Sequence, residues 1–396
     1  MAIKFQDKHY SKYADLDSKQ RALELEKEYW RYVEDNIGER MQVQYAADLS
    51  AKKFGSGFPQ YCDNEYTNHP WNLNHMDQLK NSFLQIWKDN KISGVNIPWV
   101  YVGMLYSSFW WHYEDMMMYS LNYMHKGVGK MWYAIPSQDR LKFERLVREK
   151  LAILFDEDPN MLLNITAMIS PVYLAENGVN VYKTEQKPGE FILTFPESYH
   201  AGWSTGFNVA EAVNIVCKSW VEYGLKSLSV YLKTREKVPV FSIKWIATEN
   251  IKNLKYLNFD KKTREKLLEF YSKVLQDELV ERAMIRSHFK QEEDFEKNVI
   301  KPFKPEQLQP VDCVECFFCI NLWYLSYVKC NRWKKTYCIS HELECGCPLN
   351  KIKIHERYSN DELTKFLEDA QQYMEIIEHE EQVLKAQNGV SETIII

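Results

Sequence analysis

The sequence predicts a mixed, mainly β fold: a double-stranded β-helix (jelly roll or cupin) core with helical additions and a small cysteine-rich module near its end. Three observations lead to this prediction. Residues 93–221 alternate short runs rich in β-branched and aromatic residues with Gly-containing turns, a pattern typical of a sandwich or barrel. Residues 222–305 are charged and helix-favouring, and seven of the nine cysteines lie within 313–347.

Individual segments refine this outline. Helices are expected at 17–36, at 137–157 inside the β-rich region, and at 360–388, where Asn360 is the predicted N-cap. The run PVYLAE at 171–176 is grouped with the strands. Five segments are predicted: a helical segment at 1–39, the β domain at 40–225, a helical domain at 226–308, the cysteine-rich module at 309–357, and a final helix and tail at 358–396.

The Gly-rich loop FGSGFP at 54–59 carries no phosphate-binding signature. It lacks the Lys-Ser/Thr pair of a P-loop, and its glycine spacing is not that of a dinucleotide-binding turn. We therefore expect either a lid or a packing loop.

Bulk composition excludes several classes of protein. The formal net charge is −5 with both signs mixed, so any contact with nucleic acid is expected to be local. No apolar run reaches 18 residues, which argues against a transmembrane helix. The first residues lack the apolar stretch of a signal peptide. An intracellular chain keeps its thiols reduced, so the clustered cysteines indicate metal ligation rather than disulfides.

The cysteine-rich module supplies enough ligands for two tetrahedral Zn(II) ions. Buried free thiols are the alternative, but eight soft or imidazole donors within 35 residues exceed chance. The division of the ligands between two ions stays open, as does a single complete site with a spectator ligand. The candidate ligands are Cys313, Cys316, Cys319, Cys330, Cys338, His341, Cys345 and Cys347.

A second candidate metal site lies in the β-rich region. His112 and Glu114 are two residues apart in one strand-like run, so their side chains point the same way. His200 follows the strand-like run EFILTF. Two imidazoles and one carboxylate form the facial triad of non-haem Fe(II) oxygenases, which leaves three coordination positions open. A His-x-Glu tripeptide alone is weak in a chain with ten histidines, and ordinary core or surface residues are the alternative.

Three further residues fit a carboxylate-binding site next to such a metal. Lys130 begins the strand-like run KMWYAIP, and Ser120 and Asn122 share one face of YSLNY. Together they could satisfy a buried carboxylate, whose burial is costly unless it is paired and hydrogen-bonded. The alternatives are a lysine whose charge reaches solvent and ordinary polar residues of a sheet.

These motifs resemble a known family. The stretches VGMLYSSFWWHYEDMMMYSLNYMHKGVGKMWYAIP (102–136) and FPESYHAGWSTGFNVAEAVN (195–214) resemble the Jumonji C (JmjC) domain of histone lysine demethylases. The order of the cysteines resembles the C5HC2 zinc finger that follows it in the lysine-demethylase-5 (Jumonji–ARID) group. The resemblance covers roughly residues 20–375.

The resemblance implies a function and a role for each matching residue. The expected activity is Fe(II)- and 2-oxoglutarate-dependent demethylation of lysine 4 of histone H3 in the nucleus, by N-methyl hydroxylation and release of formaldehyde. His112, Glu114 and His200 match the iron ligands. The remaining matches are Tyr45, Ser120, Asn122 and Lys130 for 2-oxoglutarate, Phe109 and Trp132 as its packing walls, and Tyr101 and Asn214 for the methylated substrate. Expected partners are the methylated H3 tail and subunits of chromatin complexes.

Two departures keep alternatives open. Ser204 stands where the family usually has Asn, beside the expected substrate pocket. No JmjN, ARID or PHD segment is recognised in the sequence. One alternative is therefore a protein hydroxylase of the same fold. Another is a catalytically weak chromatin adaptor, although the complete triad argues against it.

Overall fold

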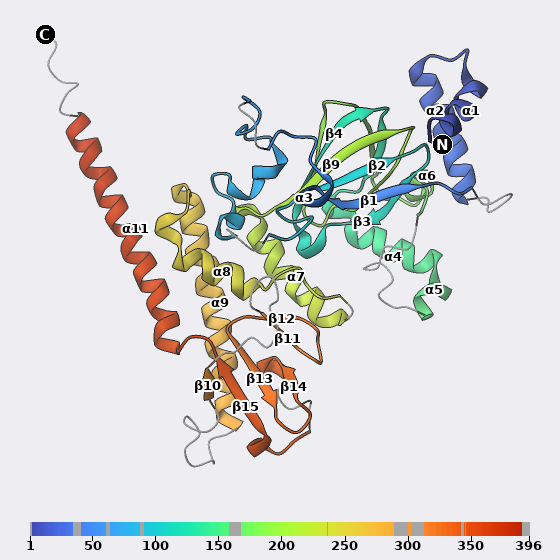
Figure 1. Ribbon diagram of the computed structural model, residues 1–396. Coiled ribbons are helices and arrows are strands. Elements are labelled where there is room, and N and C mark those ends of the chain that lie inside the picture. The colour runs from blue at the N-terminus through green and yellow to red at the C-terminus, as the bar shows by residue number, and fades with distance from the viewer. Residues whose placement is uncertain are drawn as a thin grey trace, which may run out of the picture. The chain divides into compact units, whose positions relative to one another are not determined.

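The chain folds into two compact units, shown in Figure 1. The computed structural model describes residues 2–34, 41–60, 64–87, 91–157, 168–235, 237–288, 300–302, 313–341, 344 and 346–389. The first unit comprises residues 1–78, 91–216 and 222–227, and the second comprises 79–90, 217–221 and 228–396. Within the described residues, no helix has the length and apolarity needed to cross a membrane.

Two antiparallel sheets form the centre of the first unit (Figure 1). The larger sheet has the order β1 (Tyr45–Ser50), β2 (Trp99–Gly103), β9 (Asn208–Ile215), β4 (Tyr119–Gly127) and β7 (Phe191–Thr194). The smaller has the order β3 (Ser108–His112), β8 (His200–Ser204), β5 (Lys130–Ala134) and β6 (Tyr182–Gln186). Strands distant in sequence are neighbours in both sheets, and the prediction of a mixed, mainly β jelly-roll fold is confirmed.

The smaller sheet has one face in the hydrophobic core of the first unit. Side chains alternate between the faces of a strand, so Tyr133 of β5 and Trp203 of β8 both join the core that includes Trp30 of α2 (Ser18–Glu34). Trp30 and Trp203 each donate an indole N–H to the Tyr133 hydroxyl, at 3.0 and 3.1 Å. The opposite face of the same strands therefore carries Lys130 and His200.

Helices complete the first unit: α1 (Ala2–Tyr10), α2, α3 (Ala51–Phe54), α4 (Arg140–Lys150), α5 (Ala152–Glu157) and α6 (Pro171–Glu176). The helix expected at 137–157 is present, but it is divided into α4 and α5 at Leu151. The strand expected at 171–176 is wrong, because these residues form α6. Pro171 occupies the first turn, where its fixed φ favours a helix and its missing N–H costs nothing.

The loop at 54–59 is held against the larger sheet. Ser56 Oγ and the Gly57 amide donate to the buried carboxylate of Glu211 at 2.7 and 2.9 Å. His125 Nε2 lies 2.9 Å from the same carboxylate. A Cβ on Gly57 would lie 2.5 Å from the His125 ring, so this close approach requires glycine. These contacts favour the packing loop over the lid.

The second unit combines helices with small sheets. Its helices include α8 (Ile243–Lys252), α9 (Lys261–His288) and α11 (Asn360–Gly389); α7 (Val221–Thr234) contributes residues to both units. One sheet has the order β10 (Ile300–Pro302), β15 (Ile352–Glu356), β13 (Ser326–Cys330) and β14 (Lys335–Tyr337). The other pairs β11 (Val314–Glu315) with β12 (Leu322–Trp323).

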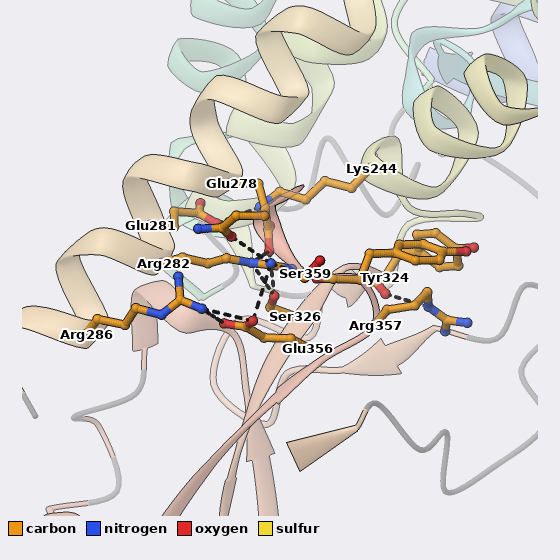
Figure 2. A network of polar contacts seen from close by, with 12 residues as sticks. Lys244, Glu278, Glu281, Arg282, Arg286, Tyr324, Ser326, Glu356, Arg357 and Ser359 are labelled. Carbon is orange, nitrogen blue, oxygen red and sulfur yellow. Dashed lines mark hydrogen bonds and ion pairs between the residues drawn. The ribbon is translucent and has the colours of Figure 1, made fainter. Parts of the chain in front are cut away.

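A buried polar network joins α8 and α9 to β13 and β15 (Figure 2). Arg282 is fully buried; its Nε donates to Glu278 at 2.8 Å and to Ser326 Oγ at 3.0 Å. Lys244 Nζ lies 2.6 Å from the other Glu278 oxygen. Arg282 Nη1 also reaches Glu356 of β15 at 3.4 Å. Because each buried charge has partners of opposite sign, the helices and the cysteine-rich module are held as one unit.

The final helix begins with a capping box. The Glu362 amide donates to Ser359 Oγ at 3.1 Å, and the Ser359 amide donates to the Glu362 carboxylate at 2.7 Å. This reciprocal pair makes Ser359 the N-cap. The predicted N-cap at Asn360 is therefore wrong by one residue.

Candidate active site and zinc centre

Three potential metal ligands converge at the face of the smaller sheet that is opposite the hydrophobic core of the first unit. The ligand atoms of His112, Glu114 and His200 all lie within 4.8 Å of one another. His112 ends β3 and pairs in register with His200, the first residue of β8, and their ring centroids are 4.3 Å apart. Glu114 follows β3, and its Oε1 lies 3.4 Å from His200 Nε2. Strand pairing thus brings together ligands that are 88 positions apart in the chain.

Backbone carbonyls determine which nitrogen of each imidazole faces the other ligands. His112 Nδ1 lies 2.7 Å from the Trp110 carbonyl, and His200 Nδ1 lies 3.0 Å from the Ser198 carbonyl. A carbonyl can only accept, so each Nδ1 carries a proton, and Nε2 is the ring nitrogen directed toward the other ligands. This is the usual arrangement for a metal-binding histidine.

Asn214 holds the carboxylate of the triad from the other side. Its Nδ2 donates to Glu114 Oε2 at 3.0 Å and to the Tyr119 carbonyl at 3.2 Å. Glu114 Oε1 therefore remains directed toward His200. Asn214 belongs to β9, so the larger sheet contributes to the orientation of a ligand carried by the smaller one.

The electrostatics favour the ligand forms of His112 and Glu114 at neutral pH. Burial and the neighbouring His200 lower the pKa of His112 to about 4. Burial acts to raise the pKa of Glu114, but hydrogen bonding and charge from His200 outweigh it and lower the pKa to about 2. Neutral imidazole and ionised carboxylate are the forms that bind a divalent cation. A donor set of two nitrogens and one carboxylate, open on one side, fits Fe(II).

Lys130 is a buried cation near this triad. It is 2% exposed, and no described carboxylate forms an ion pair with it. Its Nζ lies 3.4 Å from the Tyr45 hydroxyl and within 5.4–5.9 Å of the ring centroids of Tyr45, Phe109 and Tyr101. Burial lowers the pKa of Lys130 to about 8. Because an unpaired buried charge is costly, the surroundings of Lys130 fit an anionic ligand such as a dicarboxylate.

One aromatic side chain connects Lys130 with the triad. The ring of Phe109 packs against Trp132 at 4.7 Å and lies 6.1 and 6.4 Å from the rings of His112 and His200. Trp132 also lies 6.0 Å from His200 in a stacked orientation. Lys130 Nζ lies 5.6 Å from the centroid of the same Phe109 ring, so an anion held by Lys130 would be close to the metal ligands.

Ser120 and Asn122 are both buried in β4. Ser120 Oγ lies 2.5 Å from Thr194 Oγ1 of the neighbouring strand β7. Asn122 Oδ1 accepts a hydrogen bond from Gln186 Nε2 at 3.1 Å. Thr194 and Gln186 were not among the predicted residues, because only the strand pairing shows their contacts.

A second group of converging ligands lies in the second unit. Three sulfurs and one imidazole nitrogen come within 4.8 Å of one another, from Cys316, Cys319, Cys338 and His341. The three cysteines are buried. Four soft donors with no evident open position fit a structural tetrahedral zinc ion.

The other predicted zinc ligands are only partly described. Cys330 Sγ lies 3.5 Å from Cys347 Sγ, and Cys313 is buried. Cys345 lies outside the described residues. The pair Cys330–Cys347 is separate from the four converging ligands, so the eight candidates do not form a single group.

Comparison with protein families agrees with this geometry. Residues 99–215 match the family described as JmjC domain, hydroxylase, and residues 316–366 match the C5HC2 zinc finger. The chain contains a JmjC domain and a C5HC2 zinc finger. The JmjC match spans the triad, Lys130 and Asn214, while the zinc-finger match spans the four converging zinc ligands.

The chain is also similar to curated plant proteins. It is 35% identical over 368 residues to lysine-specific demethylase JMJ17 of Arabidopsis thaliana, which covers 88% of this chain and 29% of that protein. It is 35% identical over 374 residues to lysine-specific demethylase JMJ703 of Oryza sativa subsp. japonica, covering 91% of this chain and 30% of that protein. The chain thus spans less than a third of the length of these relatives.

The predicted substrate residues of the JmjC domain occupy different surroundings. Tyr101 packs 6.2 Å from Tyr45 and faces Lys130, and Asn214 contacts Glu114. Ser204 is fully buried, pairs in register with Lys130, and donates to Asn208 Oδ1 at 3.4 Å. Of the three, Asn214 is the one bonded directly to the triad.

Proposed function

We propose that the JmjC domain of this chain is an Fe(II)- and 2-oxoglutarate-dependent demethylase acting on methylated histone lysine. The observation that carries the proposal is a complete facial triad beside Phe109, together with a buried Lys130 near the same ring that forms no ion pair with any described carboxylate. Either feature alone has ordinary structural explanations. Together they match the two ligands that this reaction requires, a redox-active cation and a dicarboxylate.

His112, Glu114 and His200 would hold the iron through two Nε2 atoms and one carboxylate oxygen. When bound, the iron supplies the redox chemistry by which one dioxygen molecule gives one oxygen atom to 2-oxoglutarate, forming succinate and CO2, and the other to an N-methyl carbon, which then leaves as formaldehyde. The chain contributes positioning: Asn214 fixes the carboxylate, and Phe109 packs beside the two imidazoles.

Lys130 would bind the carboxylate of 2-oxoglutarate that lies away from the iron. Its ammonium group is held by burial against Tyr45, Tyr101 and Phe109, and a bound carboxylate would supply its missing counter-charge. Ser120 and Asn122 offer further hydrogen-bonding groups on the same face of β4. Trp132 and Phe109 form the apolar wall.

The proposed substrate is the methylated lysine 4 side chain of the histone H3 tail. An N-methylated ammonium group is attracted to aromatic faces, and Tyr101 offers one beside the co-substrate pocket. The names of the relatives and the family resemblance support lysine as the substrate, and the resemblance alone supports position 4 and a nuclear location. Oxidation at carbon needs no lone pair on nitrogen, so a trimethylated lysine is an acceptable substrate.

We further propose two structural zinc ions in the C5HC2 finger. One is bound by the converging set Cys316, Cys319, Cys338 and His341. The other is bound by the remaining candidates Cys313, Cys330, Cys345 and Cys347, a division supported by the Cys330–Cys347 contact. The two ligand sets then interleave along the chain, which requires both ions for a complete fold.

The decisive experiment measures formaldehyde and succinate after adding Fe(II), 2-oxoglutarate and a trimethylated H3 lysine 4 peptide. Both products should form in equal amounts, and His200→Ala should abolish them. His379→Ala, an exposed histidine of α11, is the matched control and should leave turnover unchanged. No turnover above the His200→Ala background, with iron and co-substrate bound, rejects the proposal.

Mass spectrometry of the same reaction tests the hydroxylase alternative. A demethylase removes one methyl group per turnover with formaldehyde release. A peptide that gains one oxygen atom without formaldehyde would instead identify a hydroxylase of the same fold. Parallel peptides methylated at other H3 lysines test the assignment to lysine 4.

A further inference from the structure

The Gln186 side chain connects the two sheets of the JmjC domain beside the proposed co-substrate pocket. It ends β6 and is 0% exposed. Its Oε1 accepts from the Trp132 indole at 2.9 Å. Its Nε2 donates to Asn122 Oδ1 at 3.1 Å and to the backbone carbonyls of Asn122 and Glu190 at 3.2 and 3.1 Å. A residue of the smaller sheet thus binds β4 of the larger sheet.

The chemistry of its partners determines the orientation of the Gln186 amide. The indole N–H of Trp132 can only donate, so the atom facing it must be Oε1. The two backbone carbonyls can only accept, so the atom facing them must be Nε2. The usual ambiguity between the oxygen and nitrogen of a side-chain amide does not arise here.

The orientation of the Gln186 amide also determines that of the Asn122 amide. Because Gln186 donates an N–H, the acceptor on Asn122 must be Oδ1, and Asn122 Nδ2 points away from Gln186. In the part of the chain that the structure describes, nothing accepts a hydrogen bond from this Nδ2. Asn122 lies two residues from Ser120 on β4, and Gln186 pairs in register with Lys130. The remaining donor therefore lies in the neighbourhood of the buried ammonium group.

We infer that Gln186 is a positioning residue for co-substrate binding, which holds the Asn122 amide so that Nδ2 donates to the bound dicarboxylate. This inference rests on the proposed use of 2-oxoglutarate. If Asn122 turned over, its Oδ1 would face the carboxylate and repel it. Through its bond to Trp132, Gln186 also fixes the ring that packs 6.0 Å from His200. One buried amide thus orders a co-substrate donor and an aromatic wall together.

The test measures binding of 2-oxoglutarate by titration calorimetry, with Mn(II) as a redox-silent metal. Gln186→Met keeps the length of the side chain but removes its hydrogen bonds, and should weaken binding about tenfold, the effect of losing one hydrogen bond to a charged group. Gln186→Glu replaces the donor with an acceptor and should weaken binding more, by about 100-fold. Mn(II) affinity without co-substrate should change less than about twofold in both variants, because no triad ligand contacts Gln186.

A double-mutant cycle with Asn122→Ala separates positioning from a general structural role. Once the positioned amide is absent, Gln186→Met should cost less than about twofold in affinity. In Gln186→Glu the new carboxylate repels 2-oxoglutarate directly, both with Asn122 present and in Asn122→Ala. Only the difference between the two losses of affinity therefore measures the effect of a reoriented Asn122 amide. Equal losses in the two backgrounds overturn the inference, as does wild-type affinity in Gln186→Glu.

Two further outcomes remain informative. Trp132→Phe removes the indole donor while the two carbonyls still orient Gln186, so the loss of 2-oxoglutarate affinity should stay within about threefold. A loss of about tenfold or more in Trp132→Phe would show that ring packing governs 2-oxoglutarate binding, and would overturn the inference even if Gln186→Met failed to fold. If the wild-type protein with Mn(II) binds no 2-oxoglutarate, the proposed function itself fails; if it binds and the cycle shows no coupling, only the role of Gln186 fails.

Discussion

Replacing Lys130 by methionine should stabilise the protein while it is free of co-substrate. Burial lowers the pKa of this side chain from 10.5 to about 8, which corresponds to about 3 kcal/mol of unfavourable free energy for the charged form in the folded state. Methionine has a similar length and needs no counter-ion. The hydrogen bond lost to Tyr45 is long, at 3.4 Å, and offsets only part of the gain. We therefore expect Lys130→Met to raise the free energy of unfolding by about 1–3 kcal/mol at pH 7.

The free energy of unfolding of the wild type should depend on pH because of the lowered pKa of Lys130. Between the folded pKa of about 8 and the usual lysine pKa of 10.5, the unfolded state of the wild type binds more protons at Lys130 than the folded state does. Wild-type stability therefore rises with pH through this window. At pH 10 the unfavourable contribution of Lys130 falls to about 1 kcal/mol, so the advantage of Lys130→Met should shrink accordingly.

Urea unfolding followed by tryptophan fluorescence measures both effects, at pH 7 and pH 10. Lys126→Met, an exposed lysine of β4, is the matched control and should change the free energy of unfolding by less than about 0.5 kcal/mol. Saturating 2-oxoglutarate with Mn(II) should stabilise the wild type by about 3 kcal/mol at 100 times Kd, and should leave Lys130→Met unchanged. A Lys130→Met protein that is less stable than wild type at pH 7, or that gains equally from 2-oxoglutarate, would refute the reasoning.

Three further changes test other parts of the structure. Arg282→Met should lower the free energy of unfolding of the second unit by about 3–5 kcal/mol, because it leaves a buried carboxylate with fewer partners; urea unfolding measures it, and a loss below 1 kcal/mol contradicts it. Asn214→Leu should weaken Mn(II) binding about tenfold or more, because the metal-facing carboxylate is no longer held in place. Titration calorimetry measures this affinity, and a variant that binds Mn(II) as tightly as the wild type would exclude this role of Asn214. Cys319→Ala should reduce the zinc content by about one ion per chain and lower the melting temperature, whereas Cys217→Ala, outside the module, should retain full zinc content.

Much of the site follows from residue types and their local spacing. The side chains of His112 and Glu114 were expected together because strand residues two apart share a face, and their ligand atoms do converge. Lys130 and Asn122 were expected near them from the chemistry of a buried carboxylate and from family resemblance. The prediction of a strand at 171–176 is wrong because a six-residue run is compatible with either a strand or a helix. The proline at its start favours the helix.

The contacts that orient these groups could not be read from the sequence. Asn122 and Gln186 are 64 positions apart, and Asn214 and Glu114 are 100 apart. Nothing in their local patterns indicates these partnerships, since each depends on which strands pair and in which register. The division of zinc ligands has the same cause: spacing identifies eight donors but not which loops meet. Sequence therefore predicts the inventory of reactive groups better than the hydrogen bonds that direct them.

The folded site has two adjacent places that fit ligands of opposite charge. Two imidazole nitrogens and a carboxylate oxygen converge at one of them, and a buried ammonium group near Phe109 has no carboxylate partner among the described residues. The buried ammonium group is unfavourable alone and is relieved by an anion, while the carboxylate of the triad attracts a cation. A cation at the triad and a dicarboxylate at Lys130 also attract one another, so binding of either should strengthen binding of the other. The low stability of the free site and the affinity for both ligands then have a single electrostatic origin. This predicts that 2-oxoglutarate affinity measured without metal falls well below that with Mn(II), whereas equal affinities would show that the two sites are energetically independent.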